Sequence, residues 1–133
     1  MLYDTGMRWA RAFPIVSALA WTGLIFYFSS RSEPPSAVPT TLFPGADKVA
    51  HLGEYAVWGF LAYRAALSMF RQGFSLRWVL LAGLVVAGAD EAFQSLVPGR
   101  DASWADFLAD GAGAMMGAAV GRAWWRRSSR PAV

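Results

Sequence analysis

The stretch AFPIVSALAWTGLIFYFSS, residues 12–30, runs for nineteen residues without a charged side chain. The hydrocarbon core of a bilayer is about 30 Å thick, and about 20 helical residues cross it. This stretch therefore predicts a membrane-spanning helix. A secretory signal peptide is the alternative, but the apolar run is long for one and no good A-x-A cleavage site follows it.

The composition of the whole chain agrees with a membrane protein. Of its 133 residues, 56% are hydrophobic and only 16% are charged, against about 25% charged in an ordinary soluble domain. The length predicts one domain, residues 1–133. The absence of cysteine excludes disulfides and thiolate zinc sites. The basic residues form no interleaved patch, so we expect no nucleic-acid partner.

Three weaker apolar segments follow, at 49–70, 78–97 and 107–125. Each is long enough to span a bilayer, although each carries ionisable residues that a soluble helix could equally carry. Glycine is abundant in them, as it is in membrane helices. We therefore predict an all-α integral membrane bundle of four transmembrane helices, at roughly 10–30, 48–70, 77–97 and 103–125.

Charge placement gives the bundle an orientation. If all four helices span, nine of the twelve basic residues lie on one side: Arg8, Arg11, Arg64, Arg71, Arg77, Arg122, Arg126, Arg127 and Arg130. The other side holds Arg31, Lys48 and Arg100 together with nearly all the acidic residues. The positive-inside rule then predicts that both termini are cytoplasmic, in a multi-pass protein of the inner (plasma) membrane.

The connecting segments and the glycines add detail. Residues 31–46 contain four prolines and predict an extended or turning outer loop. PGRD at 98–101 predicts a turn, and Ser103 with Asp106 resembles a capping pair that opens the fourth helix. Gly113, Gly117 and Gly121 follow a small-xxx-small rhythm that permits close helix packing, and also self-association or docking onto a larger membrane complex.

The charged stretch DEAFQSLVPGRDASWADFLAD, residues 90–110, separates two apolar segments. Polar residues spaced by three or four share a helix face, and the second, third and fourth helices bring such faces to the same depth near the outer interface. Charge facing lipid is costly, so these side chains should turn inward into one polar pocket of the outer leaflet. The predicted ligand-binding residues are Asp47, Lys48, His51, Glu54, Tyr55, Asp90, Glu91, Gln94, Arg100, Asp106 and Asp110.

Two simpler explanations stay open for these residues: interfacial charges that mark helix ends, and a network that ties the helices together without binding anything. We further expect Glu91 and Asp106 to face each other, with the Arg100 guanidinium between them.

The chemistry of the pocket is less defined than its place. A single histidine argues against zinc, and no metal or cofactor is assigned, although a carboxylate cluster could hold Mg²⁺ or Ca²⁺ that bridges to a phosphate. His51 and Glu91 are candidate acid–base residues. No nucleophile motif or Gly-rich phosphate loop is present.

Two segments carry a resemblance to a known family. DKVAHLGEYAVWGF at 47–60 and DEAFQSLVPGRDASWADFLADGAGAMMG at 90–117 resemble the VanZ-like family, whose pattern pairs D-K-x-x-H-x-x-x-Y with D-E-x-x-Q…P-G-R…D…G. The resemblance covers roughly residues 14–122 and falls on Asp47, Lys48, His51, Tyr55, Asp90, Glu91, Gln94, Arg100, Asp106 and Gly113. Asp110 stands where the family often has Asn.

The resemblance implies a small multi-helix membrane protein. The namesake of the family is linked to resistance to the glycopeptide teicoplanin, without an established biochemical activity. Three functions follow as hypotheses: binding of an amphiphilic cell-envelope lipid or lipid-linked precursor; hydrolysis or transfer at a lipid headgroup; and a non-catalytic helper of a larger membrane complex.

Overall fold

The computed structural model describes residues 3–32, 43–70 and 75–129. These residues form four α-helices with no strand between them: α1 Tyr3–Ser29, α2 Ala46–Phe70, α3 Leu76–Gln94 and α4 Trp104–Ser128. The all-α prediction is confirmed. Most helix ends lie within three residues of the predicted ones, but α1 begins seven residues earlier than predicted. Most of the predicted proline-rich loop, residues 33–42, lies outside the described residues.

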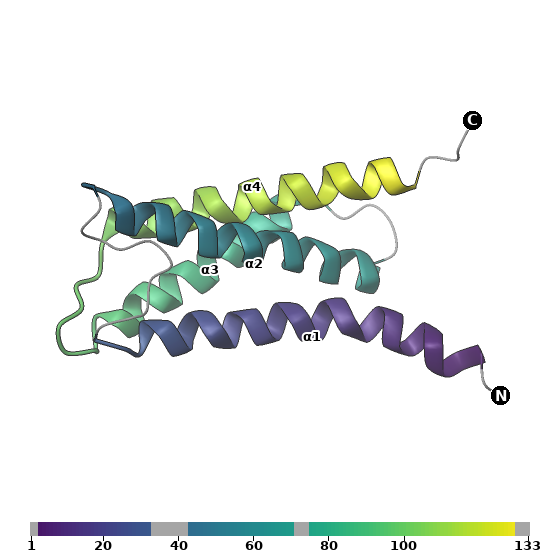
Figure 1. The fold of residues 1–133 in the computed structure, drawn as a ribbon, viewed down its shortest axis with the longest axis horizontal. Helices are drawn as coiled ribbons and strands as arrows, with labels where there is room; N and C mark the ends of the chain where they lie inside the picture. The colour runs from purple at the N-terminus through teal and green to yellow at the C-terminus, as the bar shows by residue number, and fades with distance from the viewer. Residues whose placement is uncertain (1–2, 33–42, 71–74, 130–133) are drawn as a thin grey trace.

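The helices run alternately up and down (Figure 1). The start of α1, the end of α2, the start of α3 and the end of α4 lie at one end of the bundle, here called the terminal end. The other four helix ends lie together at the opposite end, here called the polar end. In Figure 1, α2 lies between α1 and α4, and α3 lies behind them. The most extensive helix contact is that between α2 and α4.

The short connection from α3 to α4 has the predicted turn. The Arg100 N–H donates to the Val97 carbonyl at 3.1 Å, and Gly99 has a φ of +82°. Proline followed by a residue with positive φ is the signature of a type II turn, which favours glycine at this position. Ser103 then caps α4, since its side chain accepts from the Asp106 N–H at 3.4 Å.

Glycines bring α2 and α4 close together. An added Cβ on Gly117 would lie 2.7 Å from the Ala56 carbonyl carbon, and one on Gly113 would lie 3.1 Å from the Ala56 nitrogen. From the other side, a Cβ on Gly59 would lie 2.7 Å from the Ala114 carbonyl carbon. These backbone-to-backbone contacts are the predicted small-residue packing, and they occur within one chain. A partner would therefore need another face of α4.

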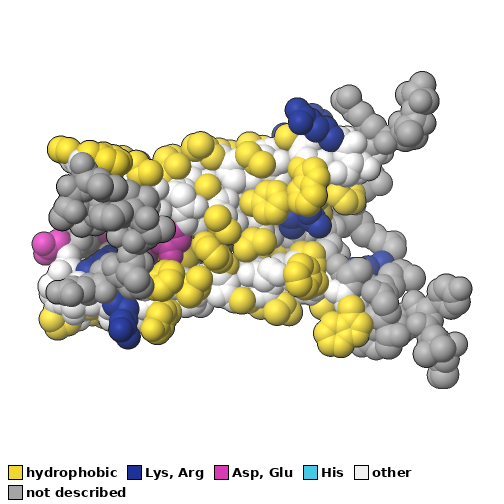
Figure 2. Space-filling model, viewed as in Figure 1, with side chains coloured by type: hydrophobic (Ala, Val, Ile, Leu, Met, Phe, Trp, Pro, Cys, Tyr) yellow, Lys and Arg dark blue, Asp and Glu magenta, His cyan; other side chains and the backbone are white. Residues whose placement is uncertain are grey.

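Exposed large apolar side chains lie on all four helices, and Figure 2 shows hydrophobic side chains spread along one face of the bundle. Phe13 is 73% exposed, Val85 72% and Leu108 66%. The interior combines an aromatic core around Tyr55, Trp58 and Tyr63 with buried carboxylates at the polar end. Carboxylates are rarely buried in soluble domains.

Within the part of the chain that the structure describes, one helix is long and apolar enough to cross a membrane by length and composition. It is the part of α1 from Arg11 to Ser29, with a mean hydropathy of 1.6, and only 11% of its most apolar stretch of 18 residues is buried inside the bundle. The predicted span at 12–30 thus corresponds to the helix that meets this criterion of length and composition.

Candidate functional site

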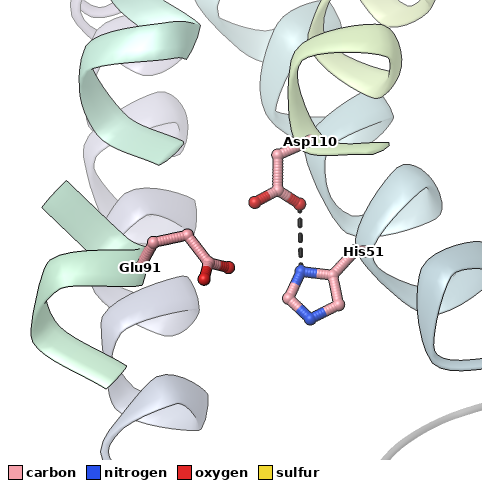
Figure 3. Close-up of side chains that lie close together, drawn as sticks. All are labelled: His51, Glu91 and Asp110. Carbon is pink, nitrogen blue, oxygen red and sulfur yellow. Dashed lines mark hydrogen bonds and ion pairs between the residues drawn. The ribbon is translucent and has the colours of Figure 1, made fainter. Parts of the chain in front are cut away.

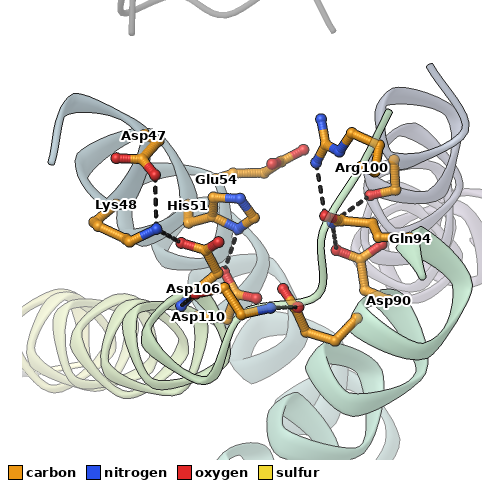
Figure 4. A network of polar contacts seen from close by, with 12 residues as sticks. Asp47, Lys48, His51, Glu54, Asp90, Gln94, Arg100, Asp106 and Asp110 are labelled. Carbon is orange, nitrogen blue, oxygen red and sulfur yellow. Dashed lines mark hydrogen bonds and ion pairs between the residues drawn. The ribbon is translucent and has the colours of Figure 1, made fainter. Parts of the chain in front are cut away.

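All eleven predicted site residues are described. They lie on the polar-end halves of α2, α3 and α4 or on the turn between α3 and α4, and Figure 4 labels most of them. Side chains from three helices converge there because antiparallel neighbours bring the start of α2, the end of α3 and the start of α4 to one level. Tyr55, Asp90, Gln94 and Asp110 are the most deeply buried, at 0%, 1%, 2% and 0% exposure. We call the eleven residues the polar cluster.

Lys48 is the cation of one half of the cluster. Its Nζ lies 2.6 Å from Asp47 Oδ2 and 2.6 Å from Asp106 Oδ1, so it joins the first turn of α2 to the first turn of α4. The hydrogen bond from Lys48 holds the pKa of Asp47, which precedes the apolar part of α2, below its usual value. A charge that only marks a helix end at the membrane interface needs no partner on another helix. Lys48 has such a partner in Asp106, so it is part of the cluster.

His51, Glu91 and Asp110 lie at the centre (Figure 3). His51 Nδ1 is 3.0 Å from Asp110 Oδ1, and one donor atom from each of the three residues lies within 4.8 Å of the other two. Glu91 is held in place because its Oε2 accepts the Ser103 backbone N–H at 2.6 Å. The end of α3 and the start of α4 are thus tied by the same carboxylate that faces His51.

Gln94 organises the remaining part. Its amide nitrogen donates to Asp90 Oδ2 at 3.1 Å and to Ser29 Oγ at 3.2 Å, and its Oε1 accepts from the Arg100 guanidinium at 2.7 Å. The predicted bridge of Arg100 between Glu91 and Asp106 is therefore wrong. Arg100 folds back toward the amide side chain instead, while Lys48 pairs with Asp106 and a backbone N–H satisfies Glu91.

Several buried oxygens of the cluster have no hydrogen-bond partner among the described residues. They belong to Glu54, Tyr55, Asp90, Glu91 and Asp110, each through one atom. Glu54 lies between His51 and Arg100 in Figure 4 and makes no hydrogen bond or ion pair with either. Buried polar atoms usually find a partner, so this end of the bundle has unused capacity to accept hydrogen bonds or to bind a cation.

Two contributors were missed by the sequence reasoning. Ser29 is 5% exposed and accepts from Gln94, which brings α1 to the cluster. The sequence could have indicated Ser29, because it lies near the outer end of the predicted first span, at the same depth as the other polar residues. Ser103 was predicted as a cap, but its backbone N–H also binds Glu91, and no side-chain pattern indicates a backbone donor.

A groove of about 490 Å³ lies elsewhere, at the terminal end, and is lined by Leu76, Ala119, Arg122, Ala123, Arg126 and Arg127. Its walls are arginine and small apolar side chains, with no carboxylate among them. The groove is therefore separate from the polar cluster and does not represent the predicted pocket.

Comparison with known proteins places the chain in a family. The family model described as VanZ/LLP1 matches residues 13–125. Searches of curated proteins and of solved structures found no match. The matched range includes most of α1, all of α2 and α3, the turn and most of α4, and so the whole polar cluster. On this match over most of its length, the chain belongs to the VanZ/LLP1 family.

Proposed function

We propose that this VanZ-like protein spans the inner membrane four times, with the terminal end in the cytoplasm. The support is the apolar exterior of all four helices and the sorting of charge between the two ends. Among the described side chains, Arg122, Arg126 and Arg127 lie on the last turns of α4 at the terminal end. Positive charge is favoured on the cytoplasmic side, so the polar cluster would lie in the outer leaflet.

We further propose that the polar cluster binds the headgroup of an amphiphilic cell-envelope lipid or lipid-linked precursor. One observation carries this proposal: carboxylates with unpartnered oxygens are buried at the polar end of a bundle that exposes large apolar side chains. In the proposed orientation that end lies at headgroup depth. An ionisable side chain at such a depth is costly unless it has a function or a partner. The acyl chains of the ligand would lie against the apolar helix faces.

The charge balance limits the headgroup. The cluster has six carboxylates, Asp47, Glu54, Asp90, Glu91, Asp106 and Asp110, against Lys48, Arg100 and the single imidazole of His51. A headgroup that donates hydrogen bonds, through hydroxyl or amine groups, fits this excess of acceptors. A bare phosphate would be repelled.

Glu54 offers the sharpest test. Its Oε1 is buried without a partner among the described residues, so its replacement removes no internal bond. The full chain, purified in mild detergent, should retain one lipid class that mass spectrometry finds enriched over the bulk membrane extract. Glu54→Leu should lose that enrichment. Asp101→Asn, which alters an exposed carboxylate at the same end, is the matched control and should keep it.

Two results would contradict the binding proposal. One is a wild-type protein whose lipids match the bulk extract; the other is a Glu54→Leu protein that keeps the enriched class.

A second function is favoured by the contact between His51 and Asp110. A carboxylate 3.0 Å from an imidazole nitrogen orients the ring and stabilises its cation, as a general base requires. A hydrolase or transferase acting on the bound headgroup would use this pair, with Glu91 as the second acid–base group. Turnover of the retained lipid, lost in His51→Asn while lipid binding persists, would support it; binding without turnover would leave the protein a binder.

A further inference from the structure

The centre of the polar cluster lacks positive charge. Lys48 is paired with Asp47 and Asp106, and Arg100 donates to Gln94. Glu91 and Asp110 are left with His51 as their one basic neighbour among the described residues. Two carboxylates in a poorly solvated place repel each other unless a cation intervenes.

The free atoms of this centre face one another. Glu91 is 8% exposed and Asp110 is fully buried, and each has one oxygen without a hydrogen-bond partner in the described chain. Figure 3 shows both carboxylates and the His51 ring directed toward a common space. The Ser103 N–H occupies the other oxygen of Glu91 and so orients the free one. Such outer contacts of a ligand residue are typical of metal sites.

The distances fit an ion. Two ligand atoms at about 2.1 Å from a metal, at right angles to each other, are about 3.0 Å apart. His51 Nδ1 and Asp110 Oδ1 are 3.0 Å apart. Donor atoms on opposite sides of an octahedral ion are about 4.2 Å apart, so the spread of up to 4.8 Å among the three residues closes through a small shift of the free Glu91 oxygen while the other oxygen keeps its bond to Ser103.

We propose that His51, Glu91 and Asp110 bind a divalent transition-metal ion. One imidazole nitrogen and two carboxylate oxygens make a mixed donor set, which suits Mn²⁺, Fe²⁺ or Zn²⁺ better than the all-oxygen ions Mg²⁺ and Ca²⁺. The ion offsets the negative charge of Glu91 and Asp110. Three protein ligands leave further coordination positions of the ion open for another ligand. The site needs no lipid to form, so it goes beyond the proposed headgroup binding and can succeed or fail separately from it.

The experiment uses the full chain in detergent with a tag that contains no histidine. After a chelator wash, the protein is titrated with Mn²⁺, and bound metal is measured by mass spectrometry and by electron paramagnetic resonance. The wild type should bind one ion per chain, and the spectrum should contain a nitrogen coupling. That coupling reports His51 alone, because the chain has one histidine.

Matched variants complete the test. Glu91→Gln and His51→Asn should weaken Mn²⁺ binding by at least about tenfold, and Asp101→Asn should leave it unchanged. A wild-type protein without specific Mn²⁺ binding, a spectrum without nitrogen coupling, or a Glu91→Gln variant with wild-type affinity would each overturn the proposal. If a variant does not fold, the wild-type titration and spectrum still decide. Lipid retention, tested through Glu54→Leu, is a separate result.

Discussion

The contact between α2 and α4 makes a strong prediction for Gly117→Ala. The new Cβ would lie 2.7 Å from the Ala56 carbonyl carbon, 2.8 Å from the Phe60 nitrogen and closer still to the Ala56 carbonyl oxygen. All three are backbone atoms in a helix, so no side-chain rotation relieves the overlap. The two helices must move apart.

The size of the effect follows from that movement. Carbon atoms pack at about 3.5–4.0 Å, so α2 and α4 must move apart by about 1 Å to relieve the overlap. A gap of that size loses up to about half of the van der Waals energy of each atomic contact along the interface. Inserting a carbon into a packed core typically costs about 1–3 kcal/mol, and a backbone clash belongs at the upper end. At roughly 4 °C per kcal/mol for a chain of this length, the unfolding midpoint should fall by about 10 °C.

The matched control is Gly53→Ala. Gly53 is a helical glycine of α2, the partner of α4 in this contact, but an added Cβ there would meet nothing within 4 Å. Alanine should there be neutral or stabilising, by about 0.5–1 kcal/mol, because it has the better helix propensity. Both variants are measured by thermal unfolding in the same detergent, with circular dichroism as the signal. Equal midpoints for the two variants would refute the close α2–α4 contact.

Three further predictions test other parts of the molecule. In a chain without native cysteine, an impermeant thiol reagent applied to intact cells should label Ser32→Cys and not Ser129→Cys; the opposite result would reverse the proposed orientation. Lys48→Met should lower the free energy of unfolding by about 2 kcal/mol because it leaves the mostly buried Asp106 uncompensated, and adding Asp106→Asn should recover most of that loss; additive effects would contradict the pairing. Gly99→Ala should cost about 1 kcal/mol in thermal unfolding because its φ of +82° is strained for alanine, and an unchanged midpoint would argue against the type II turn.

The helices and the location of the site follow from local patterns. Apolar length, helical spacing of polar residues and the Pro-Gly turn are properties of short segments, and they place Asp47, His51, Gln94 and Asp110 at one end of the bundle before any contact is known. The cap at Ser103 is equally local. These features could be predicted because each depends on neighbours within a few residues.

The partners within the site could not be predicted in the same way. Arg100 has a long side chain on a turn, and both Asp106 and Gln94 were within its reach; the direction of the turn decides between them. Lys48 pairs with Asp106 because α2 and α4 approach each other closely. That approach depends on glycine contacts between helices far apart in the sequence. The backbone donor at Ser103 has no side-chain signature at all. Pairing across helices is set by packing, which periodicity does not encode.

The packing of α2 against α4 determines the geometry of the site. Asp110 and Gly113 share a face of α4, and Gly113 lies against the Leu52 backbone, one residue from His51. The close approach at Gly113 therefore sets the distance across which His51 and Asp110 meet, 3.0 Å. A larger residue at Gly113 would separate the helices by about 1 Å, and a polar contact stretched that far exceeds about 3.5 Å and ceases to be a hydrogen bond. The small residue Gly113 is thus needed for Asp110, on the same face of α4, to remain in contact with His51.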